Sequence, residues 1–470
     1  MIAFDNSFAR LPDRMFTRLD PTPVAEPRML AHNDALARLL GIDTAWLASP
    51  AAAQVLAGNT VPDGAAPLAQ LYAGHQFGNW NPQLGDGRAI LLGEVVGTDG
   101  LRRDIQLKGA GPTPYSRSGD GRAWLGPVLR EYLVSEAMAA MGIPTTRALA
   151  AVATGESVYR ETALPGAVLT RVAASHIRVG SFQVHAARQD TDALRALADH
   201  VIARHYPNAD GIPGLLDAVV TAQASLIARW MGAGFIHGVM NTDNMAISGE
   251  TIDYGPCAFM DAYDPQQVFS SIDRQGRYAY ANQPGIALWN IAQLATALIP
   301  LMPDQDAAVD DFTTRINRFS DLYQSAWLQV FGAKIGIADA GAKDADLIQR
   351  LLTLMAESGA DFTQTFADLA TTDLPDGITD RDAFARWADD WHDRRSPDHA
   401  ALMDRANPRI IPRNHRVEEV IAAAVAGNMA PFDTLLRAVT APYAPLDAER
   451  ADLAAPPTPA EIVTATFCGT

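Results

Sequence analysis

The spacing of apolar residues along the chain changes from a strand-like to a helix-like pattern near residue 185. Before that point, short apolar runs are separated by glycine-rich turns, and residues 101–108 alternate with a period of two. Ile105 and Leu107 then share one face of a strand, and Lys108 lies on the other. We predict strands over residues 90–96, 101–108, 145–161 and 166–173.

Helices are predicted where apolar residues recur at intervals of three and four. Residues 127–143 open with a proline, which suits a first helical turn, and reach a glycine near their end, which suits a C-terminal cap. Residues 215–234 place their large apolar side chains on one stripe. Further helices are predicted over residues 285–301, 310–331 and 417–427.

This order of elements predicts an α+β fold of the protein-kinase-like bilobal type, with a small strand-rich N-lobe and a large, mainly helical C-lobe. Extensions flank the two lobes. The predicted boundaries are 1–65 for an N-terminal wrapping segment, 66–172 for the N-lobe with its nucleotide-binding loops, 173–440 for the C-lobe with its catalytic and metal loop, and 441–470 for a proline-rich tail that contains Cys468.

The composition is that of an ordinary globular protein, with 48% hydrophobic and 19% charged residues. The net charge of −17 argues against a surface for nucleic acid or for anionic membranes. The chain has no uninterrupted apolar run of about 18 residues and no signal-peptide pattern at its start, so we expect a cytoplasmic protein. The sequence does not specify the oligomeric state, and a monomer is the simpler expectation.

Lysine is rare in this chain, and its placement is informative. Nearly all basic residues are arginine, and the lysines are Lys108, Lys334 and Lys343. Because arginine and lysine are not interchangeable where one compact charge must fit, Lys108 is a candidate phosphate contact. The alternative is a solubilising lysine on an edge strand.

Further features stand in the order of the protein-kinase motifs. They are the glycine-rich loop Gly85–Arg88, Glu131 on the helix that follows Lys108, His237 with Asn244 seven positions later, and Asp253-Tyr254-Gly255 in place of Asp-Phe-Gly. Glu136 lies on another face of the same helix and competes for the ion pair with Lys108. Val239 occupies the position of the usual catalytic aspartate.

Each of these residue types has a task in handling a nucleotide. Loop glycines let backbone N–H groups approach phosphates, a lysine held by a glutamate contacts them, and Asn and Asp oxygens bind Mg²⁺ or Mn²⁺. Taken singly, "GDGRA" and "DYG" are more typical of plain turns. Their order along the chain favours a nucleotide site.

Longer motifs show a more specific resemblance. "YAGHQFGNWNPQLGDGRAILLGE", "QLKGAGPTPYSRSGDGRA", "HGVMNTDNM" and "IDYGPCAFMD" resemble the selenoprotein O family, also called the YdiU family. The resemblance covers most of the chain, from "FARLPDRMF" to "NPRIIPRNH" and the cysteine third from the end. It implies a kinase-like fold. Members of this family were long classed as pseudokinases, and they bind ATP in a reversed orientation and transfer AMP to Ser, Thr or Tyr hydroxyls of proteins.

The resemblance also implies a role for individual residues. Lys108 and Glu131 would form the ion pair, Asn244 and Asp253 would bind the metal, and Asp243 would be the catalytic base. The nucleotide site would be completed by Gly85, Gly87, Arg88, Asp120, Gly121, Arg171 and Arg178. The second "GDGRA", at residues 119–123, is thereby interpreted as a second nucleotide-contacting loop.

The two cysteines allow two interpretations. Relatives in eukaryotes carry selenocysteine where this chain has Cys468, so a redox link to Cys257 is one of them. We favour two unrelated thiols, because no spacing argument brings the tail to the site.

The predicted activity is that of a nucleotidyltransferase that attaches AMP from ATP to protein hydroxyls and releases pyrophosphate. The alternatives are UMP transfer from UTP with Mn²⁺, γ-phosphoryl transfer as in ordinary kinases, and a catalytically silent ATP-binding scaffold, which Val239 favours. The sequence does not identify the protein substrates.

Overall fold

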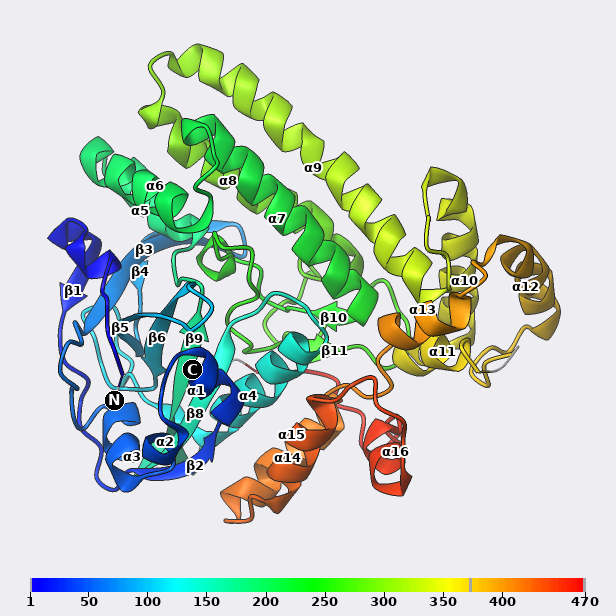
Figure 1. The fold of residues 1–470 in the computed structure, drawn as a ribbon, viewed down its shortest axis with the longest axis horizontal. Coiled ribbons are helices and arrows are strands. Elements are labelled where there is room, and N and C mark those ends of the chain that lie inside the picture. Colours follow the sequence, from blue (N-terminus) through cyan, green and yellow to red (C-terminus); the bar gives the residue numbers. More distant parts are fainter. Residues whose placement is uncertain (1, 372–373, 468–470) are drawn as a thin grey trace.

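The computed structural model describes residues 2–371 and 374–467. Its N-terminal region is built on a large antiparallel sheet, and its C-terminal region is mainly helical (Figure 1). The predicted succession of a strand-rich part and a helical part is therefore confirmed.

The large sheet contains nine strands among the described residues. Their order is β1-β3-β5-β6-β9-β8-β2, with β4 paired to β3 and β7 paired to β9, and the pairings are antiparallel. The strands are β1 (Phe16–Arg18), β2 (Arg28–His32), β3 (Leu68–Gln76), β4 (Asn79–Gly85), β5 (Ala89–Val96), β6 (Arg102–Lys108), β7 (Ala123–Trp124), β8 (Arg147–Tyr159) and β9 (Ala163–Ala173).

The predicted strands correspond to β5, β6, β8 and β9. The alternation seen in β6 is also confirmed, since Ile105 and Leu107 enter an apolar cluster while Lys108 faces the cleft described below. Strands β3 and β4 are absent from the prediction. Most of β3 is buried on both faces and shows no alternation, and β4 is largely exposed and contains Pro82.

Three short helices of the N-terminal segment pack around the same sheet. They are α1 (Asp34–Leu39), α2 (Thr44–Leu47) and α3 (Pro50–Leu56). Apolar residues of these helices, among them Leu36, Leu47 and Leu56, share a buried cluster with β5 and β6.

Helix α4 (Leu125–Ala140) is buried along most of its length between the sheet and two C-terminal helices, α14 (Asn414–Val425) and α15 (Ala430–Val439). The ring of Tyr132 contacts that of Phe432 with centroids 5.5 Å apart, and Arg130 forms an ion pair with Glu418. Because partners hold α4 from both sides, Glu131 on this helix has a fixed position.

The helical region is centred on α7 (Gly211–Ala233), which lies beside the long helix α9 (Gln305–Lys334) and beside α8 (Gln283–Leu298) (Figure 1). These three correspond to predicted helices, and α7 ends at Gly234, whose φ of 66° suits glycine. The remaining helices are α5 (Val179–Ala187), α6 (Thr191–His205), α10 (Ala345–Ser358), α11 (Phe362–Asp368), α12 (Arg381–Arg394), α13 (His399–Ala406) and α16 (Ala448–Ala454).

Two helical stretches, Gly211–Ala233 and Tyr280–Leu301, are long and apolar enough to cross a membrane by length and composition. Buried residues make up 56% and 44% of their most apolar windows, which is typical of core helices. The C-terminal tail contains α16 and returns to the protein at Thr466, which forms a parallel bridge with Ser270.

Candidate nucleotide-binding and catalytic site

A cleft with a volume of about 570 Å³ lies between the sheet and the loops at the start of the helical region. All the site residues predicted from the sequence line it except Glu131, which lies directly behind Lys108. Those that line the cleft are Gly85, Gly87, Arg88, Lys108, Asp120, Gly121, Arg171, Arg178, Asp243, Asn244 and Asp253.

At the base of the cleft, Lys108 lies between two carboxylates. Its Nζ is 2.6 Å from Oε2 of Glu131 and 2.8 Å from Oδ1 of Asp253. Arg171 bridges the same two carboxylates, at 2.7 Å from Oε1 of Glu131 and 2.6 Å from Oδ1 of Asp253. Glu136 instead pairs with Arg147 on another face of α4, so Glu131 is the partner of Lys108.

The charges of this cluster hold its carboxylates in the ionised form. Burial alone would raise the pKa of Glu131, but Arg171 and Lys108 outweigh it and the pKa lies below its ordinary value. The same balance, with Arg178 added, holds the pKa of Asp253 well below its usual range. Asp253 adopts a φ of 64°, which is uncommon for a residue with a side chain.

Arg178 connects the glycine-rich loop to the catalytic loop. Its Nη1 donates to the backbone carbonyl of Asp243 at 3.0 Å and to Oδ2 of Asp253 at 3.3 Å, and its guanidinium lies over the ring of Tyr72. Its Nη2 lies 3.5 Å from Oδ1 of Asp86. One arginine therefore reaches the glycine-rich loop, the backbone of the predicted base and a predicted metal ligand.

Sequence reasoning missed Asp86, the second residue of the first "GDGRA". Asp86 is 2% exposed, and its Oδ2 accepts hydrogen bonds from the backbone N–H of Gln70 at 3.1 Å and from Nε2 of Gln106 at 3.2 Å. One signal was available, since the period of β6 places Gln106 on the same face as Lys108.

The catalytic loop follows the two-residue strand β10 (Phe235–Ile236), which pairs with β11 (Ala258–Phe259). His237 is buried and fixed by a hydrogen bond between its Nε2 and the carbonyl of Ile252. Asn244 donates from Nδ2 to the carbonyl of Val239 at 3.0 Å, so its amide oxygen is available to a ligand. Burial raises the pKa of Asp243 to about 6, although a hydrogen bond from Gln76 acts in the opposite direction.

The donor atoms of Asn244 and Asp253 suit a hard divalent cation. Both residues line the cleft, and an amide oxygen with a carboxylate oxygen is a donor set that Mg²⁺ or Mn²⁺ completes with water and phosphate oxygens. Among the described residues there is no group of three or more His, Cys, Asp or Glu side chains that could hold a metal ion. A metal here would therefore depend on the bound nucleotide for further ligands.

The second "GDGRA" lies at the rim of the cleft. Asp120 is exposed and forms an ion pair with Arg160 at 2.8 Å, and it caps the backbone N–H of Arg122 at 2.9 Å. Gly121 has a φ of 67°, and a Cβ there would overlap the backbone of Gly111.

Comparison with known proteins identifies the family of this chain. The family model described as "Protein adenylyltransferase SelO" matches residues 1–440. This chain belongs to the SelO family.

Curated relatives of this SelO-family chain are similar along their whole length. The chain is 63% identical over 469 residues to a protein of Roseobacter denitrificans, and the alignment covers 99% of each chain. It is 62% identical over 471 residues to a protein of Ruegeria pomeroyi, and that alignment covers 100% of this chain and 99% of the relative. A protein of Bradyrhizobium diazoefficiens is 57% identical, with 99% of each chain covered. All three bear the name "Protein nucleotidyltransferase YdiU".

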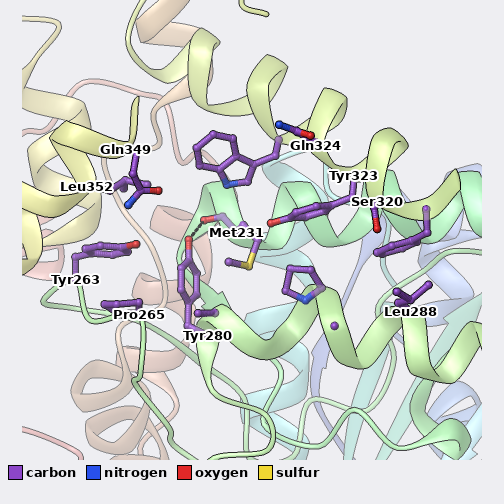
Figure 2. Close-up of a pocket in the computed structure, with 15 residues that line it drawn as sticks. Met231, Tyr263, Pro265, Tyr280, Leu288, Ser320, Tyr323, Gln324, Gln349 and Leu352 are labelled. Atoms are coloured by element: carbon purple, nitrogen blue, oxygen red, sulfur yellow. Dashed lines mark hydrogen bonds between the residues drawn. The ribbon is translucent and has the colours of Figure 1, made fainter. Parts of the chain in front are cut away.

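A second cavity in this SelO-family chain does not suit a nucleoside triphosphate. It has a volume of about 600 Å³ and lies between α8 and α9, where Tyr280 donates a hydrogen bond to the carbonyl of Met231 (Figure 2). Its lining is aromatic, aliphatic and neutral polar, and no charged side chain takes part. Since phosphates need compensating charge, the basic cleft is the better nucleotide site.

The tail of this SelO-family chain reaches the loop that follows Asp253. Thr466 donates from Oγ1 to the carbonyl of Pro256 at 2.6 Å, and Cys257 is the next residue. Burial raises the pKa of the Cys257 thiol to about 12, while Cys468 lies outside the described residues. The spacing along the chain did not predict this proximity, and the interpretation of Cys257 and Cys468 as two unrelated thiols stays a prediction.

Proposed function

We propose that this protein is a kinase-like, two-lobed enzyme that transfers AMP from ATP to Ser, Thr or Tyr hydroxyls of proteins. The observation that carries the proposal is the cleft itself. In a protein of net charge −17, it gathers Arg88, Lys108, Arg171 and Arg178 around a buried carboxylate pair. Nη1 of Arg88 is buried and has no hydrogen-bond partner within the described part of the chain, as expected of a donor whose partner is a bound anion.

The proposed reaction is an in-line displacement at the α-phosphorus. A bond forms between the acceptor oxygen and this phosphorus, and the bond to the bridging oxygen of the β-phosphate breaks, so pyrophosphate leaves with the electron pair. Lys108, Arg171 and Arg178 would stabilise the charge that develops on the leaving pyrophosphate. Asp243 would accept the proton of the attacking hydroxyl and later release it to water.

A divalent cation, when bound by Asn244 and Asp253, would neutralise phosphate charge and orient the nucleotide. Positioning and electrostatics are expected to matter more than base strength, because transition states of this kind are loose. The boundaries predicted above for the two lobes, residues 66–172 and 173–440, are retained in this proposal.

A labelling experiment tests the proposal. The purified protein is incubated with an acceptor protein mixture and Mg²⁺ or Mn²⁺, with ATP labelled at the α-phosphate in one reaction and at the γ-phosphate in another. We expect protein-bound label from the α-position alone. Label from the γ-position alone would identify a kinase, and ATP binding without any label would identify a silent scaffold.

A parallel reaction with α-labelled UTP tests the choice of base. The name of the relatives specifies nucleotidyl transfer without naming the nucleotide, and the phosphate contacts proposed above do not distinguish adenine from uracil. We expect ATP to be preferred over UTP with Mg²⁺. Faster labelling from UTP with Mn²⁺ would assign the protein to UMP transfer instead.

A further inference from the structure

The hairpin formed by β3 and β4 reaches across the cleft and holds the catalytic loop. Its tip has two residues with positive φ, Phe77 at 51° and Gly78 at 81°. Three hydrogen bonds then join consecutive residues of the two segments: His75 N–H to Oγ1 of Thr242 at 2.7 Å, Gln76 Nε2 to Oδ2 of Asp243 at 3.1 Å, and Phe77 N–H to Oδ1 of Asn241 at 3.0 Å.

The hairpin tip is anchored independently of the Gln76 side chain. The ring of Phe77 contacts that of Tyr278 with centroids 5.1 Å apart, and the Tyr278 hydroxyl donates to Oδ1 of Asn241 at 2.7 Å. His75 contacts the ring of Trp289 edge-on at 5.2 Å and lies 3.0 Å from Nε2 of Gln183. Loss of the Gln76 amide would therefore leave the hairpin in place.

The two oxygens of the Asp243 carboxylate have different surroundings. Oδ1 is buried, has no hydrogen-bond partner within the described residues, and lies so close to Gly74 that a Cβ there would overlap it. Oδ2 accepts the hydrogen bond from Gln76. Arg178 contacts the backbone carbonyl of Asp243, whereas Gln76 donates its hydrogen bond to the carboxylate itself.

We propose that Gln76 is a positioning residue for nucleotidyl transfer, which holds Oδ2 of Asp243 where the acceptor hydroxyl must approach. Gly74 encloses one oxygen and Gln76 orients the other, so the carboxylate of a loop in the helical region is set by a hairpin of the sheet. The hydrogen bonds between the hairpin and the loop therefore set the position of the Asp243 carboxylate. This inference rests on the proposed function, in which Asp243 takes the proton of the hydroxyl.

The test replaces Gln76 by methionine, which keeps the shape of the side chain and removes the donor. At saturating ATP, we expect Q76M to lower the rate of AMP transfer about 10- to 100-fold, as the loss of a hydrogen bond to a charged group does. The Kd for ATP should be unchanged, because the Gln76 side chain donates to Asp243 and the proposed phosphate contacts come from other residues. Q183A, which removes a hairpin contact away from the carboxylate, should stay within about threefold of wild type.

A double-mutant cycle separates positioning from a general structural role. If Gln76 acts through Asp243, the double variant Q76M/D243N should be no slower than D243N alone. Losses that multiply, a parallel loss of ATP affinity, or a wild-type rate in Q76M would overturn the inference. A wild-type enzyme that transfers no nucleotide would overturn the proposed function and this inference with it, whereas an active wild type with an unaffected Q76M would overturn this inference alone.

Discussion

The two copies of "GDGRA" have the same five residues and opposite environments. Each leads into a strand, the first into β5 at Ala89 and the second into β7 at Ala123. Asp86 of the first copy is 2% exposed, and burial raises its pKa despite the neighbouring Arg178. Asp120 of the second copy is exposed, and its hydrogen bonds from Arg160 lower its pKa.

The difference shows that the surrounding elements, and not the motif, decide what the aspartate does. The first copy is enclosed by β3 and β6, whose Gln70 and Gln106 donate hydrogen bonds to it, so its carboxylate becomes part of the wall of the proposed nucleotide site. The second copy ends a long loop, and its carboxylate meets an arginine at the solvent boundary. The inner copy should therefore matter for both stability and catalysis, and the outer copy much less.

The largest contrast is expected between the arginines that face the two aspartates. R178A removes contacts to Asp86, to Asp253 and to the catalytic loop, and should lower the rate of transfer about 100- to 1000-fold. R160A should lower it less than about threefold, because an exposed pair contributes little. Initial rates with α-labelled ATP measure both, with circular dichroism as a check of folding. Equal losses in the two variants would abolish the distinction between the copies.

A third carboxylate extends the comparison. Glu250 is half-buried, and its side chain accepts hydrogen bonds from the Ala174 N–H and the Ser248 hydroxyl, which are both uncharged. Burial raises its pKa to about 7. The folded state therefore favours the protonated acid, and the stability linked to Glu250 is greatest below about pH 4.5 and falls by roughly 3 kcal/mol as the pH rises to about 7.

The variant E250Q removes this titration. Relative to wild type, it should gain stability when urea unfolding is repeated from about pH 5 to about pH 8. A difference that is independent of pH would show that Glu250 is already ionised in the folded protein across this range, and that burial does not outweigh the influence of the nearby Arg103.

A smaller contrast is expected in stability between the two aspartates themselves. D86A leaves the buried donors of Gln70 and Gln106 without their acceptor and should cost about 2 kcal/mol. D120A removes an exposed ion pair and should cost less than about 1 kcal/mol. The stabilities of D86A and D120A are compared through their urea unfolding midpoints at constant pH. A larger loss in D120A than in D86A would reverse the assignment of inner and outer copies.

The sequence predicted those parts of the fold that have a clear period and those parts of the site that belong to motifs. The alternation in β6 placed Lys108 on the cleft side, and the helical pattern located α7 and α9. The choice of Glu131 over Glu136 came from the family resemblance and not from the residue pattern, since it depends on which face of α4 lies beneath β6 and β9.

Other features depend on contacts between residues that are distant along the chain. Gln76 reaches Asp243 across 167 positions, and Thr466 reaches Pro256 across 210. Asp86 is buried because β3, a strand without alternation, lies beside it. No local pattern reports such contacts, and they appear only when the sheet and the helical region are assembled.

The co-product of the reaction tests the central claim most directly. The purified protein is incubated with ATP, a divalent cation and an acceptor protein, and the pyrophosphate and ADP that form are measured together with the nucleotide attached to protein. If the cleft presents the α-phosphorus, pyrophosphate should appear in an amount equal to the AMP attached, and R178A should reduce both together. ADP in an amount equal to protein-bound phosphate, without attached AMP, would contradict the account.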